Sequence, residues 1–269
     1  MNMKERQKQI NKEAFFAMVQ RDLVAQWRDK GEFIFRVCML PLVLIVVYGY
    51  VLPHIGMLPE NFPTQMFAGM IGMSILITGI HGTAIPFTMD FNNMHEIEDR
   101  LQAPVSVNLV AYAKMLVGII EAFIGGLIVL PISLIFMGSN VHLSLVADKI
   151  PLLILVLILI ALASATLGLL VGTIIRPMQI AAMFPGFLMP VVFTGAIFFS
   201  WKKLAAVPVF QKLVLINPLV YANEALRYCL TPQIDSMPIG FSLLGLVVAI
   251  VIMGYFGFRR FHQMATGER

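Results

Sequence analysis

Glu121 is the residue whose setting most needs a chemical explanation. It is the one Asp, Glu, Lys or Arg between Met115 and Ala147, in an otherwise apolar run. A charged group at membrane depth costs about 2.5–3.5 kcal/mol on insertion scales, so such residues usually have a function. Glu121 could carry a proton or contact a substrate, but a structural polar contact is slightly favoured, because glycines share its helix face. Its candidate partners are Lys114, Arg176, His81 or a residue of a neighbouring chain.

No catalytic or cofactor-binding set of residues can be recognised in the sequence. The phosphate-loop pattern GxxxxGK[ST], the nucleophile elbow GxSxG and the zinc motif HExxH are all absent. The five histidines have no metal-like spacing; they are His54, His81, His95, His142 and His262. We therefore expect no catalytic, cofactor-binding or metal-binding residues, and a chain that provides a pathway or a scaffold.

The composition is that of an integral membrane protein. Of the 269 residues, 59% are hydrophobic and only 13% are charged, with a mean hydropathy of +0.85. Soluble domains usually carry about 25% charged residues, so these values exclude an ordinary soluble enzyme, a disordered chain and a nucleic-acid-binding module. We attribute the net charge of +4 to loops that face anionic lipid and cytoplasm.

Six apolar stretches are long enough to cross a bilayer as helices, which takes roughly 20 residues each. They cover about 34–53, 66–88, 112–137, 150–175, 180–200 and 239–258. The predicted fold is therefore an all-α integral membrane protein with six transmembrane helices. Four prolines fall inside these stretches and are expected to kink the helices rather than end them: Pro41, Pro131, Pro185 and Pro190.

The distribution of basic residues predicts the orientation. Six spans put both termini on one side of the membrane. The N-terminal segment, the loops after the second and fourth spans, and the C-terminal tail hold 14 Lys and Arg, whereas the opposite face holds 5. The positive-inside rule therefore places both termini in the cytoplasm.

The N-terminal segment has the pattern of an amphipathic helix. Four apolar residues recur at intervals of four, with Phe16 beside them: Phe15, Val19, Leu23 and Trp27. Such a helix would lie in the cytoplasmic interface, with its aromatic residues in lipid. It could be a plain anchor or a docking surface for a cytoplasmic partner; the pattern alone favours the anchor.

Two connecting segments are unusual. The cytoplasmic loop after the second span gathers charges in a chain that has few, namely Glu96, Glu98, Asp99 and Arg100, and Ile97 and Leu101 would form one ridge of a short helix. This loop could be solvated, or it could be a rigid helix that fits a soluble subunit. The segment 201–238, on the outer side, is too apolar for a soluble loop and is expected to lie at the membrane surface or to re-enter it.

Stripes of small residues recur every four positions in three predicted spans. The stripes are Ser164, Gly168 and Gly172; Gly118, Ala122 and Gly126; and Gly245 and Ala249. They predict close helix packing, within or between chains, and indicate dimerisation only weakly.

The order of these features, and two motifs, resemble a known family. The motifs are Leu101-Gln102-Ala103-Pro104-Val105-Ser106, which leads to Lys114, and Asn217-Pro218-Leu219-Val220-Tyr221-Ala222-Asn223-Glu224-Ala225-Leu226-Arg227. The chain is similar to the permease subunit of type-2 ATP-binding-cassette exporters, in the branch of the nodulation-factor, daunorubicin-resistance and polysaccharide export permeases. Many relatives carry a basic, glycine-containing stretch before the first motif, whereas this chain is acidic there.

The resemblance implies roles for the segments. Residues 1–33 would hold the interface helix, 34–258 the permease domain, and 259–269 a cytoplasmic tail. The coupling helix, at about 94–103, would meet the ATPase through Glu96, Glu98, Asp99, Arg100 and Leu101. Two re-entrant helices at about 204–230 would form an outer gate shaped by Asn217, Pro218, Tyr221, Glu224 and Arg227. Glu224 and Arg227 are three positions apart, so they can pair on a helix.

The resemblance also implies partners. Two copies of an ATP-binding-cassette ATPase would bind ATP and Mg, so this chain would need no cofactor of its own. A second permease copy would complete a pathway for a hydrophobic or lipid-linked substrate in the bacterial inner membrane, and no nucleic acid would bind. Two alternatives are a proton-coupled secondary transporter that uses Glu121, with His81 as a possible helper, and a membrane scaffold without transport.

Overall fold

The computed structural model describes residues 3–28, 30–92, 107–143, 146–175, 177–179, 182 and 184–266, and this part of the chain is helical with no strand. Five helices in it are long and apolar enough to cross a membrane: Lys30–His54, Phe62–Met89, Asn108–Met137, Ala147–Ile174 and Ile239–Thr266. They agree with five of the six predicted spans. The acidic loop with its coupling-helix residues, 94–103, lies outside the described residues.

The long helices follow an N-terminal helix, α1 (Met3–Arg28). The first crossing joins α2 (Lys30–Leu44), a π-helix η1 (Ile45–Val51) and α3 (Leu52–His54); the others are α4 (Phe62–Asn92), α6 (Val107–Met137), α7 (Ile150–Ile174) and α12 (Ile239–Thr266). Pro41 in α2 and Pro131 in α6 lie inside their helices, as expected. The last helix continues well past the predicted end of its span at 258, so the first part of the predicted tail is helical.

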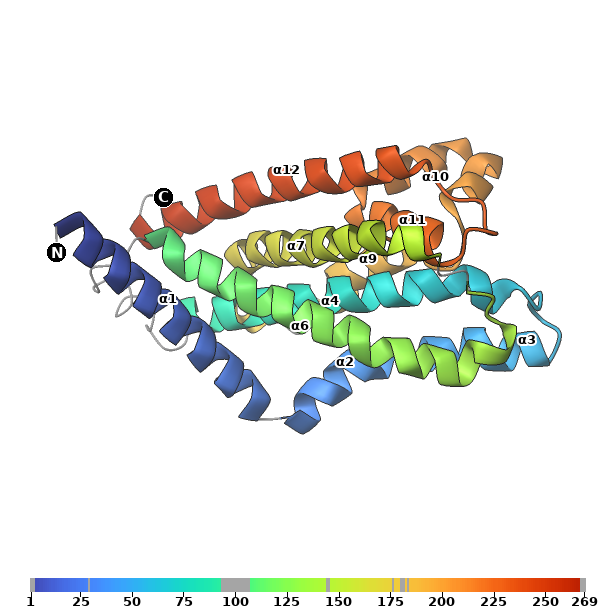
Figure 1. Cartoon of the computed structure of the whole chain (residues 1–269), viewed down its shortest axis with the longest axis horizontal. Helices are drawn as coiled ribbons and strands as arrows, with labels where there is room; N and C mark the ends of the chain where they lie inside the picture. The colour runs from blue at the N-terminus through green and yellow to red at the C-terminus, as the bar shows by residue number, and fades with distance from the viewer. Residues whose placement is uncertain are drawn as a thin grey trace.

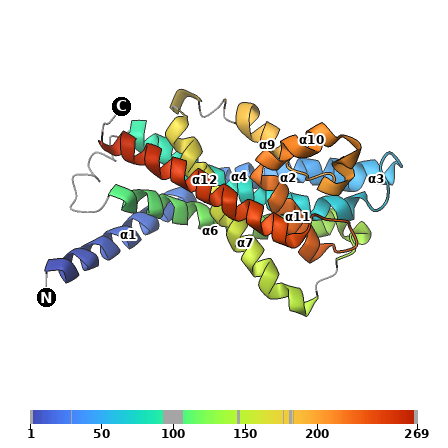
Figure 2. The same ribbon diagram turned by 90° about the horizontal axis from the view of Figure 1, so that it is seen from above.

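Short elements complete the chain. Next to α7 are η2 (Gly138–Asn140), η3 (Ala147–Lys149) and η4 (Pro177–Gln179). Before α12 come η5 (Phe184–Leu188), α9 (Met189–Thr194), η6 (Trp201–Ala206), α10 (Pro208–Leu213), η7 (Val214–Ile216) and α11 (Pro218–Leu230). Both chain ends lie at one end of the helical bundle, and α3 and α10 lie at the other (Figures 1 and 2).

The predicted span at 180–200 differs from the others. Its described helical part consists of η5 and α9, with five and six residues, and the helix ends at Thr194. The chain then turns through Ala196, which has a positive φ of 53°. A helix needs roughly 20 residues to cross the bilayer core, so this short helix does not establish a sixth span. The sixth span therefore stays a prediction.

The core of the bundle is built around α4. In its most apolar stretch, 94% of the residues are buried, against 17% in α12. Small residues allow this close packing: a Cβ at Gly168 would lie 2.8 Å from Thr83 of α4, and a Cβ at Gly118 would lie 1.9 Å from the same side chain. The stripes of small residues therefore pack helices within the chain.

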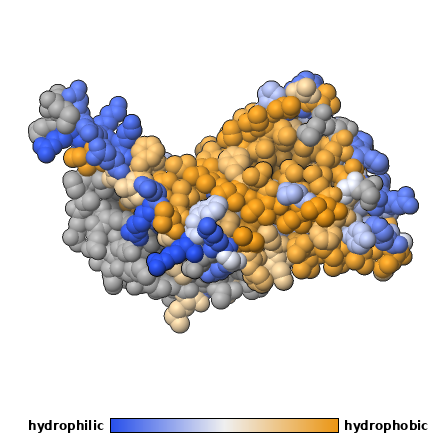
Figure 3. Space-filling model, turned by 60° about the horizontal axis from the view of Figure 1, so that its bottom comes forward, coloured by the Kyte–Doolittle hydropathy of each residue, from blue (hydrophilic) through white to orange (hydrophobic). Residues whose placement is uncertain are grey.

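The outward faces of the long helices are apolar. Large exposed side chains on α12 include Leu244, Val251 and Tyr255, with exposed fractions of 60%, 63% and 61%. Figure 3 shows a broad hydrophobic surface, with hydrophilic residues at both ends of the molecule and in one cluster between them. In a bilayer this surface would contact lipid, because apolar patches of this extent are rare on soluble monomers.

Candidate functional site

A buried ion pair lies at the centre of the end opposite the termini. Arg227 Nη1 donates to Glu224 Oε1 at 2.6 Å, and neither side chain is exposed. The two residues are one turn apart on α11, so the helix brings them together. Burial lowers the pKa of the Arg227 guanidinium, and the Glu224 carboxylate acts in the opposite direction. The sequence predicted this pair, and the structure confirms the contact.

Arg227 also joins α11 to two other segments. Its Nη2 donates to the carbonyl oxygens of Ala196 at 2.9 Å, Gln65 at 3.2 Å and Ile197 at 3.4 Å. Two of these carbonyls follow the end of α9, where the helix can no longer pair them. The guanidinium, with five N–H donors, is suited to this task. Arg227 therefore holds the turn after α9 against the start of α4.

Glu224 makes the matching contacts on the acceptor side. Its Oε1 accepts a bond from the Trp201 backbone N–H at 2.8 Å, and its Oε2 accepts one from the Met237 N–H at 2.6 Å. Trp201 begins η6, and Met237 precedes α12. A buried ion pair is stable only when its remaining donors and acceptors are also paired, and here they are. We call this arrangement around Glu224 and Arg227 the outer cap, after the side on which the sequence predicts it to lie.

Asn217 and Pro218 start the helix that carries the cap. Asn217 Oδ1 accepts a bond from the Leu219 N–H at 2.9 Å, as an N-cap residue does, and Pro218 occupies the first helical position. The Asn217 amide also donates to the carbonyl of Val191 at 2.7 Å and to the hydroxyl of Thr194 at 2.9 Å. The Asn-Pro pair thus both begins α11 and attaches it to α9.

Tyr221 connects the cap to the last span. Its hydroxyl donates to the Leu215 carbonyl at 2.8 Å. A Cβ at Gly245 of α12 would lie 2.4 Å from the Tyr221 ring, so only glycine permits this approach.

The five residues predicted for an outer gate therefore all lie on α11 or at its N-cap, and most of this helix is buried. Two further residues that the sequence did not single out belong to this network: Gln65, which accepts from Lys203 Nζ at 2.5 Å, and Asn223, which donates to the Gly195 carbonyl at 2.6 Å.

The N-terminal helix contacts protein along the face that was expected to lie in lipid. Val19 is buried in a cluster with Ala113 and Val117 of α6, and Phe15 and Leu23 pack against this cluster. Phe16 and Trp27 remain exposed by 58% and 47%. The predicted N-terminal helix is confirmed, but its face of Phe15, Val19 and Leu23 covers the start of α6, which α1 lies along (Figure 1).

An ion pair that the sequence did not predict fastens α1 to α6. Lys114 Nζ lies 2.7 Å from Asp22 Oδ2, and the two side chains are 2% and 5% exposed. Glu121 instead has Arg36 of α2 as its ion-pair partner, with 3.7 Å between Arg36 Nη2 and Glu121 Oε2. Lys114, one of the candidate partners of Glu121, therefore pairs with Asp22 of α1 instead.

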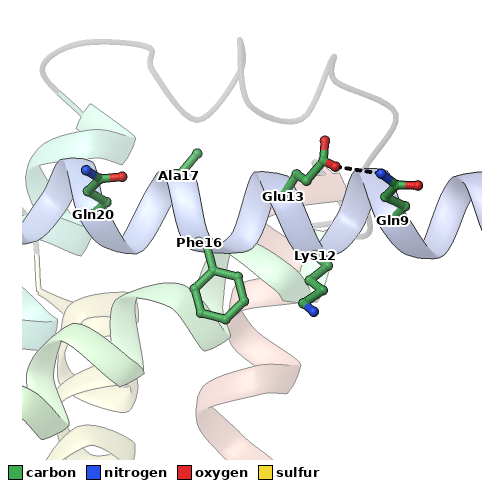
Figure 4. Close-up of a pocket in the computed structure, with 6 residues that line it drawn as sticks. All are labelled: Gln9, Lys12, Glu13, Phe16, Ala17 and Gln20. Carbon is green, nitrogen blue, oxygen red and sulfur yellow. Dashed lines mark hydrogen bonds between the residues drawn. The ribbon is translucent and has the colours of Figure 1, made fainter.

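The outer side of α1 carries a shallow pocket of about 590 Å³. Its lining residues all belong to α1: Gln9, Lys12, Glu13, Phe16, Ala17 and Gln20. Figure 4 shows Lys12 and Phe16 pointing to one side of the helix and Glu13 and Ala17 to the other, with a hydrogen bond of 2.9 Å from Gln9 to Glu13. This mixed polar and apolar surface is distinct from the face that packs on α6.

The comparisons identify the family. A model of the ABC-2 type transporter family matches residues 13–231, from within α1 to the end of α11. The chain belongs to the ABC-2 type transporter family. The inner membrane transport permease YadH of Escherichia coli K12 is 27% identical over 188 residues, which cover 70% of this chain and 69% of YadH. The YadH of Shigella flexneri matches to the same extent.

This ABC-2 family member is thus a membrane transport permease. Within the residues that the structure describes, no group of three or more His, Cys, Asp or Glu side chains could hold a metal ion. The predicted ATPase contacts of the acidic loop, Glu96, Glu98, Asp99, Arg100 and Leu101, fall outside the described residues, so their role remains a prediction.

Proposed function

We propose that this permease is the membrane subunit of an ATP-driven exporter that works with two copies of a separate ATPase. The observation that carries the proposal is the extent of the family match, which runs from residue 13, within α1, to residue 231 and includes Glu224 and Arg227. ATP and Mg would bind to the ATPase. A second permease copy would complete the pathway, and both termini would lie in the cytoplasm, as the excess of basic residues at that side favours.

In this proposal the two ends of the bundle have different tasks. The end with the termini would receive the ATPase through the pocket on α1 and the acidic loop at 94–103. The opposite end, held by Glu224 and Arg227, would form the outer gate. ATP would drive transport by binding more tightly to one access state than to the other, because a ligand shifts an equilibrium only by its differential affinity.

The expected substrate is hydrophobic or lipid-linked, such as a drug, a lipid or a glycolipid. The apolar character of the spans favours this class over a small polar solute. Substrate would move between the two permease copies, and the outer cap would have to shift for its release.

A second candidate, a proton-coupled transporter, is favoured by one observation. Within the described part of the chain, neither carboxylate oxygen of the buried Glu121 accepts a hydrogen bond. A carboxylate in this state can be protonated without losing such bonds. In this mechanism transport would follow the proton gradient, would need no ATPase, and would be abolished by Glu121→Gln.

The test is to isolate the tagged permease from its native membrane in mild detergent and to assay ATP hydrolysis. We expect an ATPase of about 25–35 kDa, the size of one or two domains, to co-purify with hydrolytic activity. The matched control is the triple charge reversal of Glu96, Glu98 and Asp99, which should insert normally but lose the ATPase. A homogeneous permease with no partner and no hydrolysis would contradict the proposal and favour the proton-coupled mechanism.

A further inference from the structure

Five polar residues from three helices meet at the elbow between α1 and α2. Asp22 and Gln26 come from α1, Arg36 from α2, and Lys114 and Glu121 from α6. Three contacts join them: Lys114 to Asp22 at 2.7 Å, Arg36 Nη2 to Gln26 Oε1 at 3.4 Å, and Arg36 Nη2 to Glu121 at 3.7 Å. We call this set the elbow ring.

The helix repeat explains how these three contacts are linked into a ring through the helices that carry them. Lys114 and Glu121 are seven positions apart, so they lie two turns apart on one stripe of α6. Asp22 and Gln26 are four positions apart and share one face of α1. Each of these two helices therefore supplies two neighbouring groups, and Arg36 closes the gap between them. The four charges of the ring alternate in sign and cancel.

The two ion pairs of the ring differ in length and in exposure to solvent. The Asp22–Lys114 ion pair is short, at 2.7 Å, its two side chains are buried, and it lies beside the apolar cluster around Val19. The other pair is longer, and the Arg36 side chain is 23% exposed. Among the described residues, Arg36 Nε, Gln26 Nε2 and both Glu121 oxygens have no hydrogen-bond partner.

Buried polar atoms without partners are unfavourable, so the loose side of the ring has a reason to change. A shift of about 1 Å would bring the Arg36 guanidinium to hydrogen-bonding distance of Glu121. Glu121 has little room to retreat, because a Cβ at Gly82 of α4 would lie 2.5 Å from its Oε2. Arg36, whose side chain is 23% exposed against 1% for Glu121, has more freedom to make this shift, and Arg36 belongs to α2.

We propose that Asp22–Lys114 is a fixed fastening that makes α1 move with α6, and that Arg36–Glu121 is the contact that closes and opens as α2 moves relative to α6. The ring then couples the helix that carries the exposed pocket to the intramembrane carboxylate. The four charged residues of the ring act by positioning the helices: Asp22, Lys114, Arg36 and Glu121. This coupling rests on the proposed function only in that an ATPase would supply the force on α1.

The test uses the full-length permease alone in lipid nanodiscs, so it does not depend on finding the ATPase. Cys38 and Cys229 are first replaced by serine. Spin labels at exposed positions then report distances: Gln20 with Tyr112 for the fastening, and Phe35 with Leu127 for the elbow. A third pair, on α7 and α12, serves as a control for overall folding.

For the fastening, we expect one narrow α1–α6 distance in the unmodified permease. Lys114→Asp should broaden it, since two carboxylates then face each other, and the charge swap Asp22→Lys with Lys114→Asp should restore it. A distribution that stays narrow in the single variant would overturn the fixed fastening. If the single variant does not fold, the double variant still decides the question. A double variant that folds but shows a broad α1–α6 distance would also overturn the fixed fastening.

For the elbow, we expect two α2–α6 distances in the unmodified permease. Glu121→Gln keeps the side-chain volume but removes the charge, and should change the ratio of the two populations by about tenfold toward the open one. A single distance that Glu121→Gln leaves unchanged would overturn the moving contact. Both results can be obtained whether or not an ATPase co-purifies, so failure of this inference and failure of the proposed function are distinguishable.

Discussion

Glu224 and Arg227 lie one turn apart on α11 and form an ion pair of 2.6 Å from which solvent is excluded. Through this pair, segments that are distant in sequence are held together: the start of α4, the turn after α9, η6 and the residues before α12. The pair thus organises the whole outer end of the bundle, and the stability of that end should depend on it.

Glu224→Ala should destabilise the permease by about 3–5 kcal/mol, because it leaves the Arg227 charge buried without its partner. Thermal unfolding in detergent would measure the loss. The double variant Glu224→Leu with Arg227→Leu should lose much less than the sum of the single variants, since it buries no unpaired charge. If Glu224→Ala unfolds at the temperature of the unmodified protein, the pair does not stabilise the outer end.

Asn217→Ala should cost about 1 kcal/mol through loss of the N-cap, and more through the loss of its bonds to Val191 and Thr194. Asn217→Asp is the matched control, because it keeps the capping acceptor but cannot donate to the Val191 carbonyl. We expect Asp to fall between Asn and Ala in unfolding temperature. An Asp variant no more stable than Ala would show that capping contributes nothing here.

Gly245→Ala should destabilise the permease by about 1–3 kcal/mol, the usual range for overpacking. The added methyl would lie 2.4 Å from the Tyr221 ring and would push α12 away from α11. Gly240→Ala is the control on the same helix, since nothing lies within 4 Å of its Cβ position. Equal unfolding temperatures for the two variants would contradict the close contact between α11 and α12.

Tyr221→Phe removes only the hydroxyl that donates to the Leu215 carbonyl. Loss of one such bond should cost about 0.5–1.5 kcal/mol, with the ring still packed on α12. The unfolding temperature should therefore drop less than in Gly245→Ala. A larger drop would mean that the hydroxyl, rather than the ring, holds η7 and α11 together.

Much of the architecture could be predicted because hydropathy and helix length are local properties. Five spans, the N-terminal helix, and the close pair of Glu224 and Arg227 follow from residues that are neighbours in sequence or on one helix. The environment of the N-terminal helix could not be predicted, because a stripe such as Phe15, Val19 and Leu23 covers protein as readily as lipid.

The contacts that the sequence did not reveal join distant segments. Asp22 pairs with Lys114, and Arg36 faces Glu121, across loops that no periodic pattern describes. Lys114 was a reasonable partner for Glu121, since both lie on one helix face. The fold-back of α1 brings a better carboxylate to it. Likewise, Arg227 was expected to pair with Glu224, but its bonds to the carbonyls of Ala196 and Ile197 depend on where α9 ends.

The role of Arg227 in holding Ala196 and Ile197 has a consequence for biosynthesis. Ribosomes make the chain from its N-terminus, so the turn after α9 leaves the ribosome before the residue that pairs its carbonyls. Unpaired backbone groups are costly away from water, so this turn can settle only after α11 has been made. The outer end should therefore assemble late, after the helices around α4 have already packed.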